Sequence, residues 1–185
     1  MNFCSHCGAP VEHKIPPGDL LPRYVCSRCQ AVHYQNPLVV MGCIPQWNDK
    51  ILLCKRAIEP RRGHWTLPAG FLENGETLAE AAARETREEA VTEVQILDLF
   101  SIVNVPHIRQ VHMFYLARLM RPEFSPSDES LEVGLYAEKE IPWDDIAFPT
   151  VFRTLMAYFE DRRAGQYRLH ILDIPRPAPK PVRDC

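Results

Sequence analysis

Three glutamates crowd into one short stretch of the chain, and their spacing could hold a divalent metal ion. Glu85, Glu88 and Glu89 follow the i, i+3, i+4 spacing that places side chains on one face of a helix. Like charges at this spacing destabilise a helix by roughly 0.2–0.5 kcal/mol per pair, and acidic groups near its C-terminus oppose the helix dipole. Converging carboxylate oxygens are the ligands that Mg²⁺ and Mn²⁺ prefer. The spacing favours a metal site, with a solvated charged face as the alternative.

Two C-x-x-C pairs near the start of the chain predict a metal site of a different kind. Cys4 and Cys7 are followed, after 18 residues, by Cys26 and Cys29. Four thiolates at this spacing are typical of a tetrahedral structural zinc site, and two chance pairs of thiols are the alternative. A segment this short cannot build a real core, so it needs the metal to fold alone. We predict a zinc ribbon over residues 1–36.

The nearby histidines and the other cysteines receive no chemical role. Because four sulfurs complete a zinc shell, we expect the histidines beside the pairs to be surface residues. These are His6, His13 and His33. The three remaining cysteines are predicted to be free thiols: Cys43, Cys54 and Cys185.

A helix that begins near Leu78 must position the glutamates. Thr77 and Glu80 form a capping-box pattern at its start. Glu80 precedes Arg84 by four residues, and Arg84 precedes Glu88 by four, which are favourable spacings for ion pairs. A stripe of small residues is predicted to pack against a sheet and to leave the glutamates accessible on the opposite side. The stripe consists of Ala79, Ala83, Thr86 and Ala90.

Apolar, β-rich runs on both sides of this helix predict strands, so the fold class is α+β. The predicted strands cover residues 38–47, 50–56, 94–105, 111–120, 131–137 and 167–174, and the first two form a hairpin. A second helix is predicted within residues 148–165, with Gly165 as its C-terminal stop. The proline-rich tail, residues 175–185, is expected to be extended or disordered.

The composition indicates a globular protein without a strong charge bias. Hydrophobic residues make up 46% of the 185 residues, charged residues 24%, and the net charge is −3. No overall basic field argues for nucleic acid, and no apolar run is long enough to cross a membrane. The first residues lack the pattern of a secretory signal, so we expect a cytoplasmic protein.

The glutamates belong to a longer pattern that resembles the Nudix box, the signature of the Nudix hydrolases. Gly70, Glu76 and the run Arg84-Glu85-Thr86-x-Glu88-Glu89 match it at fixed offsets. The box normally continues with glycine, where this chain has Val91, a change that affects the helix exit and not a ligand. The resemblance implies the Nudix fold, a mixed sheet sandwiched between helices, over residues 37–174 behind the zinc ribbon.

The layout resembles three groups of Nudix pyrophosphatases. A zinc ribbon before the box is typical of NADH pyrophosphatases, but their Ser-Gln-Pro-Trp-Pro-Phe-Pro stretch is missing here. Pro106, 15 residues after Val91, matches the ADP-ribose pyrophosphatases. The runs "YQNP", "LLCKRAIEP" and "WTLPAGFLE" most closely resemble the plant chloroplast FAD pyrophosphatases. These likenesses imply metal-dependent hydrolysis of FAD or ADP-ribose to release AMP, with NADH as the alternative substrate.

The same resemblance assigns roles to particular residues. Glu85, Glu88 and Glu89 are the expected ligands of Mg²⁺ or Mn²⁺ and the expected catalytic carboxylates, with Glu76 and the backbone at Gly70 as further contacts. Arg84 is expected to orient them by pairing with a glutamate. The zinc ligands are Cys4, Cys7, Cys26 and Cys29.

Other roles have ordinary alternatives. A later loop offers Glu129 and Glu132 as general base, and we select Glu132, for which a plain surface glutamate is the alternative. Arg56 is a candidate for phosphate binding. Trp65 and Phe71 could stack on a base or flavin, although aromatic residues at such positions usually pack in the core.

Two expectations concern partners and class. By analogy with the family we expect a homodimer acting on a small nucleotide, with no membrane partner, and nucleic acid as the weakest candidate for the ribbon. The competing class is a non-catalytic Nudix-fold regulator that senses a ligand or binds nucleic acid. Such a protein would be expected to lose box carboxylates, and this chain keeps them.

Overall fold

The computed structural model describes residues 1–176 in two compact units, which divide between Pro37 and Leu38. Most of the predicted proline-rich tail, from residue 177 on, and Cys185 lie outside the described residues. No helix in residues 1–176 is long and apolar enough to cross a membrane.

The N-terminal unit is a small antiparallel sheet. Its strands, in the order β1-β2-β3, are β1 (Val11–Lys14), β2 (Arg23–Cys26) and β3 (Val32–His33). Only Cys4, Val25 and Cys26 are buried hydrophobic residues in this unit. The unit has almost no apolar core, as its length predicted.

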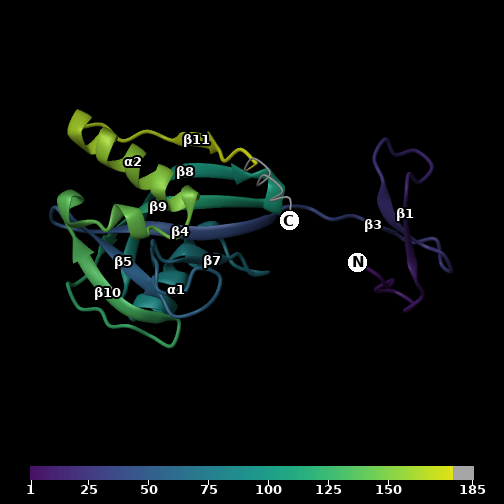
Figure 1. The fold of residues 1–185 in the computed structure, drawn as a ribbon, viewed down its shortest axis with the longest axis horizontal. Coiled ribbons are helices and arrows are strands. Elements are labelled where there is room, and N and C mark those ends of the chain that lie inside the picture. The colour runs from purple at the N-terminus through teal and green to yellow at the C-terminus, as the bar shows by residue number, and fades with distance from the viewer. Residues whose placement is uncertain (177–185) are drawn as a thin grey trace, which may run out of the picture. The chain divides into compact units, whose positions relative to one another are not determined.

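The second unit is built on one mixed sheet (Figure 1). Its strands are β4 (Leu38–Trp47), β5 (Lys50–Arg56), β6 (Trp65–Thr66), β7 (Ala69–Phe71), β8 (Val94–Val105), β9 (Gln110–Leu119), β10 (Ser130–Tyr136) and β11 (His170–Asp173). The main path runs β10-β5-β4-β9-β8-β11, with β6 beside β5 and β7 beside β4. The pairs β4–β9 and β8–β11 are parallel and the others antiparallel.

Two helices, α1 (Leu78–Ala90) and α2 (Pro149–Ala164), cover opposite faces of the sheet. Alternation along the strands explains this, because successive side chains point to opposite faces. Cys43 packs with Ala82 of α1, whereas the next residue, Ile44, packs in the cluster that contains Leu155 of α2. The predicted α+β class, with a mixed sheet between helices, is confirmed.

Most predicted elements agree with the structure. The strands β4, β5 and β8 match their predicted ranges, and β9 and β10 begin and end one residue earlier. Helix α2 ends at Gly165, whose φ of 71° is the left-handed conformation expected of a C-terminal glycine. The last predicted strand is shorter than expected, and the short strands β6 and β7 were not predicted because Pro and Gly dominate their region.

Candidate active site

The start of α1 is fixed by the predicted capping box. The Glu80 N–H donates to Thr77 Oγ1 at 3.2 Å, and the Thr77 N–H donates to Glu80 Oε2 at 2.8 Å. This engagement takes Glu80 away from Arg84, so the expected Glu80–Arg84 pair is wrong. Arg84 binds Glu76 instead, while the predicted Arg84–Glu88 pair forms at 2.9 Å.

The buried face of α1 differs from the predicted stripe. Its buried residues are Ala81, Ala82, Glu85, Thr86, Glu89 and Ala90. Ala79 and Ala83 are only half-buried, and Glu85 and Glu89 are 7% and 5% exposed rather than accessible. The hydroxyl of Thr86 explains the rotation, because it donates to the Ala82 carbonyl and lies 3.1 Å from the Cys43 sulfur of the sheet. Two of the three glutamates therefore point inward, and only Glu88 is exposed.

Arg84 is the centre of the carboxylate cluster. Its guanidinium makes five hydrogen bonds: two to Glu76 at 2.9 and 2.8 Å, one each to Glu85 at 2.7 Å and Glu88 at 2.9 Å, and one to the Phe71 carbonyl at 3.1 Å. All five N–H groups of an arginine are thereby used. The pairing holds the pKa of Glu76 at about 2, with help from the Glu73 N–H. Arg84 thus ties the loop before α1 to the glutamates on it.

Gly70 makes space for Glu85. Its strand, β7, is paired with β4 so that Gly70 lies opposite Met41. A Cβ atom at residue 70 would lie 2.3 Å from Glu85 Oε2, a distance at which atoms overlap. Only glycine allows the backbone to approach a buried carboxylate this closely. Any larger residue at position 70 would therefore have to displace the Glu85 carboxylate, which Arg84 holds at 2.7 Å.

Glu89 is a buried carboxylate that lacks part of its hydrogen bonding. Its Oε2 atom is buried and has no hydrogen-bond partner. Burial, followed by the charge of Glu85, raises the pKa of Glu89 to about 8, and Arg56 opposes the shift. Burial also raises the pKa of Glu85, against the pull of Arg84. A buried carboxylate that lacks a partner fits a cation site, because a bound cation would supply the missing interaction.

The two candidate bases lie in different surroundings. The charge of Glu129 raises the pKa of both Glu85 and Glu89, which places it beside the cluster. Its carbonyl accepts a hydrogen bond from the Ala57 N–H at 2.8 Å. Glu132, the residue that the sequence favoured, forms an ion pair with Lys55 at 2.7 Å on β10 and is exposed. Glu132 lies in β10 beyond a register shift in the pairing with β5, whereas Glu129 lies before the strand begins.

The predicted substrate-binding residues are not all gathered at the cluster. Arg56 lies near Glu89 and stacks over the Phe148 ring at 5.1 Å. Phe71 is 51% exposed beside Arg84. Trp65 is 7% exposed and contacts Tyr136 edge to face, so the packing alternative describes it. Pro106 begins the exposed turn η1 (Pro106–Ile108) after β8.

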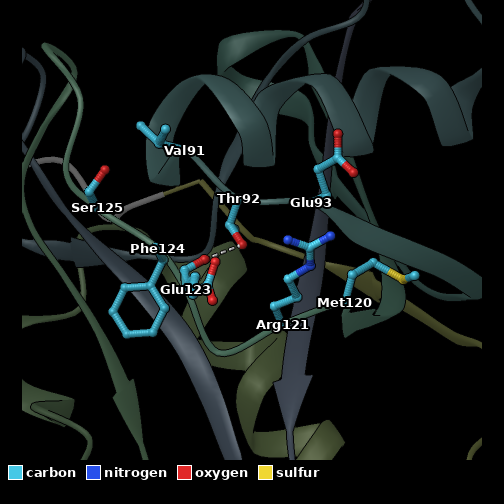
Figure 2. Close-up of a pocket in the computed structure, with 8 residues that line it drawn as sticks. All are labelled: Val91, Thr92, Glu93, Met120, Arg121, Glu123, Phe124 and Ser125. Atoms are coloured by element: carbon cyan, nitrogen blue, oxygen red, sulfur yellow. Dashed lines mark hydrogen bonds between the residues drawn. The ribbon is translucent and has the colours of Figure 1, made fainter.

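The helix exit has a strained residue where the box glycine is missing. Val91 has φ 48° and ψ 44°, the left-handed region, and its N–H donates to the Arg87 carbonyl. The exit lines a cavity of about 600 Å³ shared with the loop after β9 (Figure 2). Thr92 donates to the Glu123 carbonyl at 2.7 Å across it. None of the cluster glutamates lines this cavity.

Replacing Val91 with glycine is expected to stabilise the protein. The left-handed conformation costs a non-glycine residue roughly 1–2 kcal/mol, and glycine removes this cost. Part of the gain is lost, because glycine makes the unfolded chain more flexible. We expect a net gain of about 0.5–1 kcal/mol in the free energy of unfolding, measured in urea on zinc-loaded protein. The control Val91→Ala keeps a Cβ atom and should gain less. A glycine variant no more stable than the alanine variant would contradict the explanation.

The four predicted zinc cysteines converge in the N-terminal unit. The sulfurs of Cys4, Cys7, Cys26 and Cys29 lie within 4.8 Å of one another, and no other group of three or more such ligands is this close within residues 1–176. The N–H groups of Cys29 and Arg28 donate to the Cys26 sulfur and lower its pKa to about 6. Such bonds favour the thiolate, the form that binds zinc.

His33 departs from its prediction as a surface residue. It is half-buried, and its Nε2 lies 3.3 Å from the Cys4 sulfur. Hydrogen bonds from outside the ligand shell orient metal ligands, and His33 is placed to act in this way on Cys4. His6 and His13 are exposed, as expected, and Cys43 and Cys54 are buried free thiols.

Two family models match the chain, one over each of the two units. Residues 2–35 match the zinc-ribbon family described as Nudix N-terminal. Residues 36–153, well over half of the chain, match the NUDIX domain.

Named relatives match part of the chain. An ADP-ribose pyrophosphatase of Methanocaldococcus jannaschii is 29% identical over 115 residues, which are 59% of this chain and 67% of that protein. An NAD-capped RNA hydrolase NudC of Photobacterium profundum is 30% identical over 144 residues, 76% of this chain and 52% of that protein. The chain thus spans about half the length of this relative.

A solved structure has the same fold along nearly the whole chain. The crystal structure of a NUDIX hydrolase from Nitrosomonas europaea is 54% identical and superposes with a TM-score of 0.89. The match covers 94% of this chain and 100% of that one.

Proposed function

The chain belongs to the Nudix family, and on this premise we propose that it hydrolyses the pyrophosphate bond of a nucleoside diphosphate derivative, with FAD or ADP-ribose favoured, and releases AMP. The observation that carries the proposal is the buried carboxylate of Glu89, which has an oxygen without a hydrogen-bond partner and interacts with Glu85 and Arg56. A purely structural helix face has no reason to bury a carboxyl group that lacks a hydrogen-bond partner.

The residues that would hold Mg²⁺ or Mn²⁺ are Glu85, Glu88 and Glu89, beside the backbone at Gly70. Such an ion would lower the pKa of an attacking water and neutralise charge on the phosphates. Both oxygens of Glu76 are bound by Arg84, so we assign Glu76 to holding Arg84 in place. Arg84 in turn orients Glu85 and Glu88.

The remaining roles fall to residues around the cluster. We place the general base at Glu129 rather than Glu132, because Glu129 interacts with Glu85 and Glu89 whereas Glu132 is paired with Lys55. Arg56 is proposed to bind a substrate phosphate, because its guanidinium lies near Glu89 and a planar guanidinium suits phosphate oxygens.

A panel of substrates tests the proposal. Zinc-loaded protein is incubated with FAD, ADP-ribose, NADH and nucleoside triphosphates in Mg²⁺ or Mn²⁺, and the products are separated by chromatography. We expect AMP from FAD or ADP-ribose at the highest kcat/KM. Absence of turnover for every dinucleotide would overturn the proposal.

NADH is the second candidate substrate. The likeness to NudC extends over 76% of this chain, and the chain carries a Nudix zinc ribbon. The missing Ser-Gln-Pro-Trp-Pro-Phe-Pro stretch argues against it. A kcat/KM for NADH above that for FAD and ADP-ribose would decide for this candidate. A homodimer and a cytoplasmic location are further proposals by family analogy, testable by sedimentation and by cell fractionation.

A further inference from the structure

A second cavity, of about 360 Å³, is lined by residues on both sides of the Phe148 ring's segment and by none of the cluster glutamates. It lies between the loop after β5 and the segment that leads into α2. Its lining includes Arg61, His64, Asp144, Ile146, Phe148 and Phe152. Small-molecule pockets commonly measure about 300–1,000 Å³, so this one suits one half of a dinucleotide and not the whole molecule.

Arg56 connects this cavity to the glutamates. On one side its charge acts on Glu89, and on the other its guanidinium lies 5.1 Å from the centre of the Phe148 ring, which lines the cavity. The backbone N–H of Arg56 donates to the carbonyl of His64, a second lining residue, at 2.9 Å, and the guanidinium Nε donates to the Pro60 carbonyl at 2.9 Å. A phosphate held at Arg56 would therefore leave its attached nucleoside at the mouth of this cavity.

The aromatic walls are supported from behind. Phe152 is 38% exposed and packs edge to face on Trp143 at 5.6 Å. Trp143 is itself fixed by a hydrogen bond from its Nε1 to the Glu138 carbonyl at 3.1 Å. The neighbouring wall is pinned to β6, because the Ala147 N–H donates to the Trp65 carbonyl at 2.8 Å. Supported aromatic rings that remain open to solvent are suited to stacking on a planar base.

We propose that this cavity binds the adenosine half of the substrate, with the adenine ring against Phe152 and Phe148 and its amino group donating to Asp144. The inference rests on the proposed function, and it deepens that function by assigning a specificity site. Asp144 is the only carboxylate that lines the cavity within the described chain, and a carboxylate accepts from an exocyclic amine. FAD, ADP-ribose and NADH all contain adenosine, so the site would serve each of them.

Phe152→Ala tests the stacking, with Met156→Ala as its matched control. Met156 lies one turn further along α2, is 47% exposed and does not line the cavity. Loss of base stacking typically weakens binding about 5- to 100-fold. We expect Phe152→Ala to raise the KM for the best substrate and the inhibition constant of AMP by that factor, with kcat within about twofold, and Met156→Ala to change neither.

Asp144→Leu tests the choice of base, because leucine has a similar size and cannot accept a hydrogen bond from the amino group, whereas asparagine still could. Wild-type protein should bind AMP more tightly than inosine 5′-monophosphate, which lacks the amino group, and the variant should lose this preference. Equal constants for Phe152→Ala and Met156→Ala in an active enzyme would overturn the cavity assignment and leave the proposed function standing. If Phe152→Ala raises the inhibition constant of FMN but not that of AMP, the adenosine assignment is overturned.

Direct binding separates the two proposals if no dinucleotide is hydrolysed. Calorimetry then measures AMP binding to wild-type protein in Mg²⁺. Binding that Phe152→Ala weakens and Met156→Ala keeps would support the cavity site even as hydrolysis fails. No AMP binding by wild-type protein would overturn the inference.

Discussion

Glutamine at residue 88 or 89 is expected to lower kcat/KM by at least about 100-fold, equivalent to about 2.7 kcal/mol of transition-state stabilisation. Each change removes a proposed ligand charge while it keeps the size and shape of the side chain. Steady-state kinetics on the best substrate in Mg²⁺ measures the effect. Glu160→Gln, at an exposed position on α2, is the matched control and should retain wild-type activity.

Replacing the buried residue Glu89 should raise the stability of the protein, although it lowers activity. Burial raises the pKa of Glu89 from 4.5 to about 8, so the folded state holds this proton more tightly than the unfolded state. The stability of protein without added Mg²⁺ should therefore fall as the pH rises from about 4.5 to about 8. Glu89→Gln removes this dependence and should be more stable than wild type by about 1–3 kcal/mol at pH 8, but not at pH 5.

Exposed Glu88 offers the contrast. Glu88→Gln should lower activity without the gain in stability expected of Glu89→Gln, because Glu88 is the only exposed glutamate of the three. Near-normal activity in both variants, with cooperative melting, would show that the cluster is not the metal site. An active Glu89→Gln with the predicted gain in stability would restrict Glu89 to a structural role.

Removal of zinc is expected to unfold the N-terminal unit. Of its three buried hydrophobic residues, two are the proposed ligands Cys4 and Cys26, so little apolar burial remains without the metal. Structural zinc contributes on the order of 10 kcal/mol or more to such units. Metal analysis should find about one zinc per chain, and Cys4→Ser should lose it and expose residues 1–37 to rapid amide exchange.

The second unit should survive this change. Its hydrophobic clusters contain only residues from Cys43 onward, so none of its core depends on the ribbon. Cys185→Ser, a matched change outside the described residues, should keep the zinc. A folded ribbon with slow amide exchange in zinc-free protein would contradict the prediction.

Local sequence signals predicted the elements well where one residue decides the conformation. Thr77 caps α1 and Gly165 ends α2 as expected, because each satisfies backbone groups that have no partner within the helix. The cysteine pairs predicted their own cluster, since metal-ligand spacing is a property of the local chain. The mixed sheet between helices followed from the Nudix resemblance.

Features set by packing between distant segments could not be predicted. Alanines lie on several sides of α1, so small side chains did not indicate which face of the helix is buried. The contact that determines the buried face joins Thr86 to Cys43, which are 43 residues apart in the sequence. The place of Glu132 depends on a register shift in β10 that no residue type signals. Gly70 was predicted as a site residue, but the carboxylate that requires it is visible only in three dimensions.

The central claim, hydrolysis at a pyrophosphate bond by a metal-dependent carboxylate cluster, is tested most directly by phosphorus NMR. Zinc-loaded protein is mixed with ADP-ribose, and Mg²⁺ is then added. We predict that the pyrophosphate resonances persist until Mg²⁺ is present and are then replaced by the phosphomonoester resonances of AMP and ribose 5-phosphate. Pyrophosphate resonances that persist in Mg²⁺, for ADP-ribose and for FAD and NADH in parallel samples, would contradict the claim.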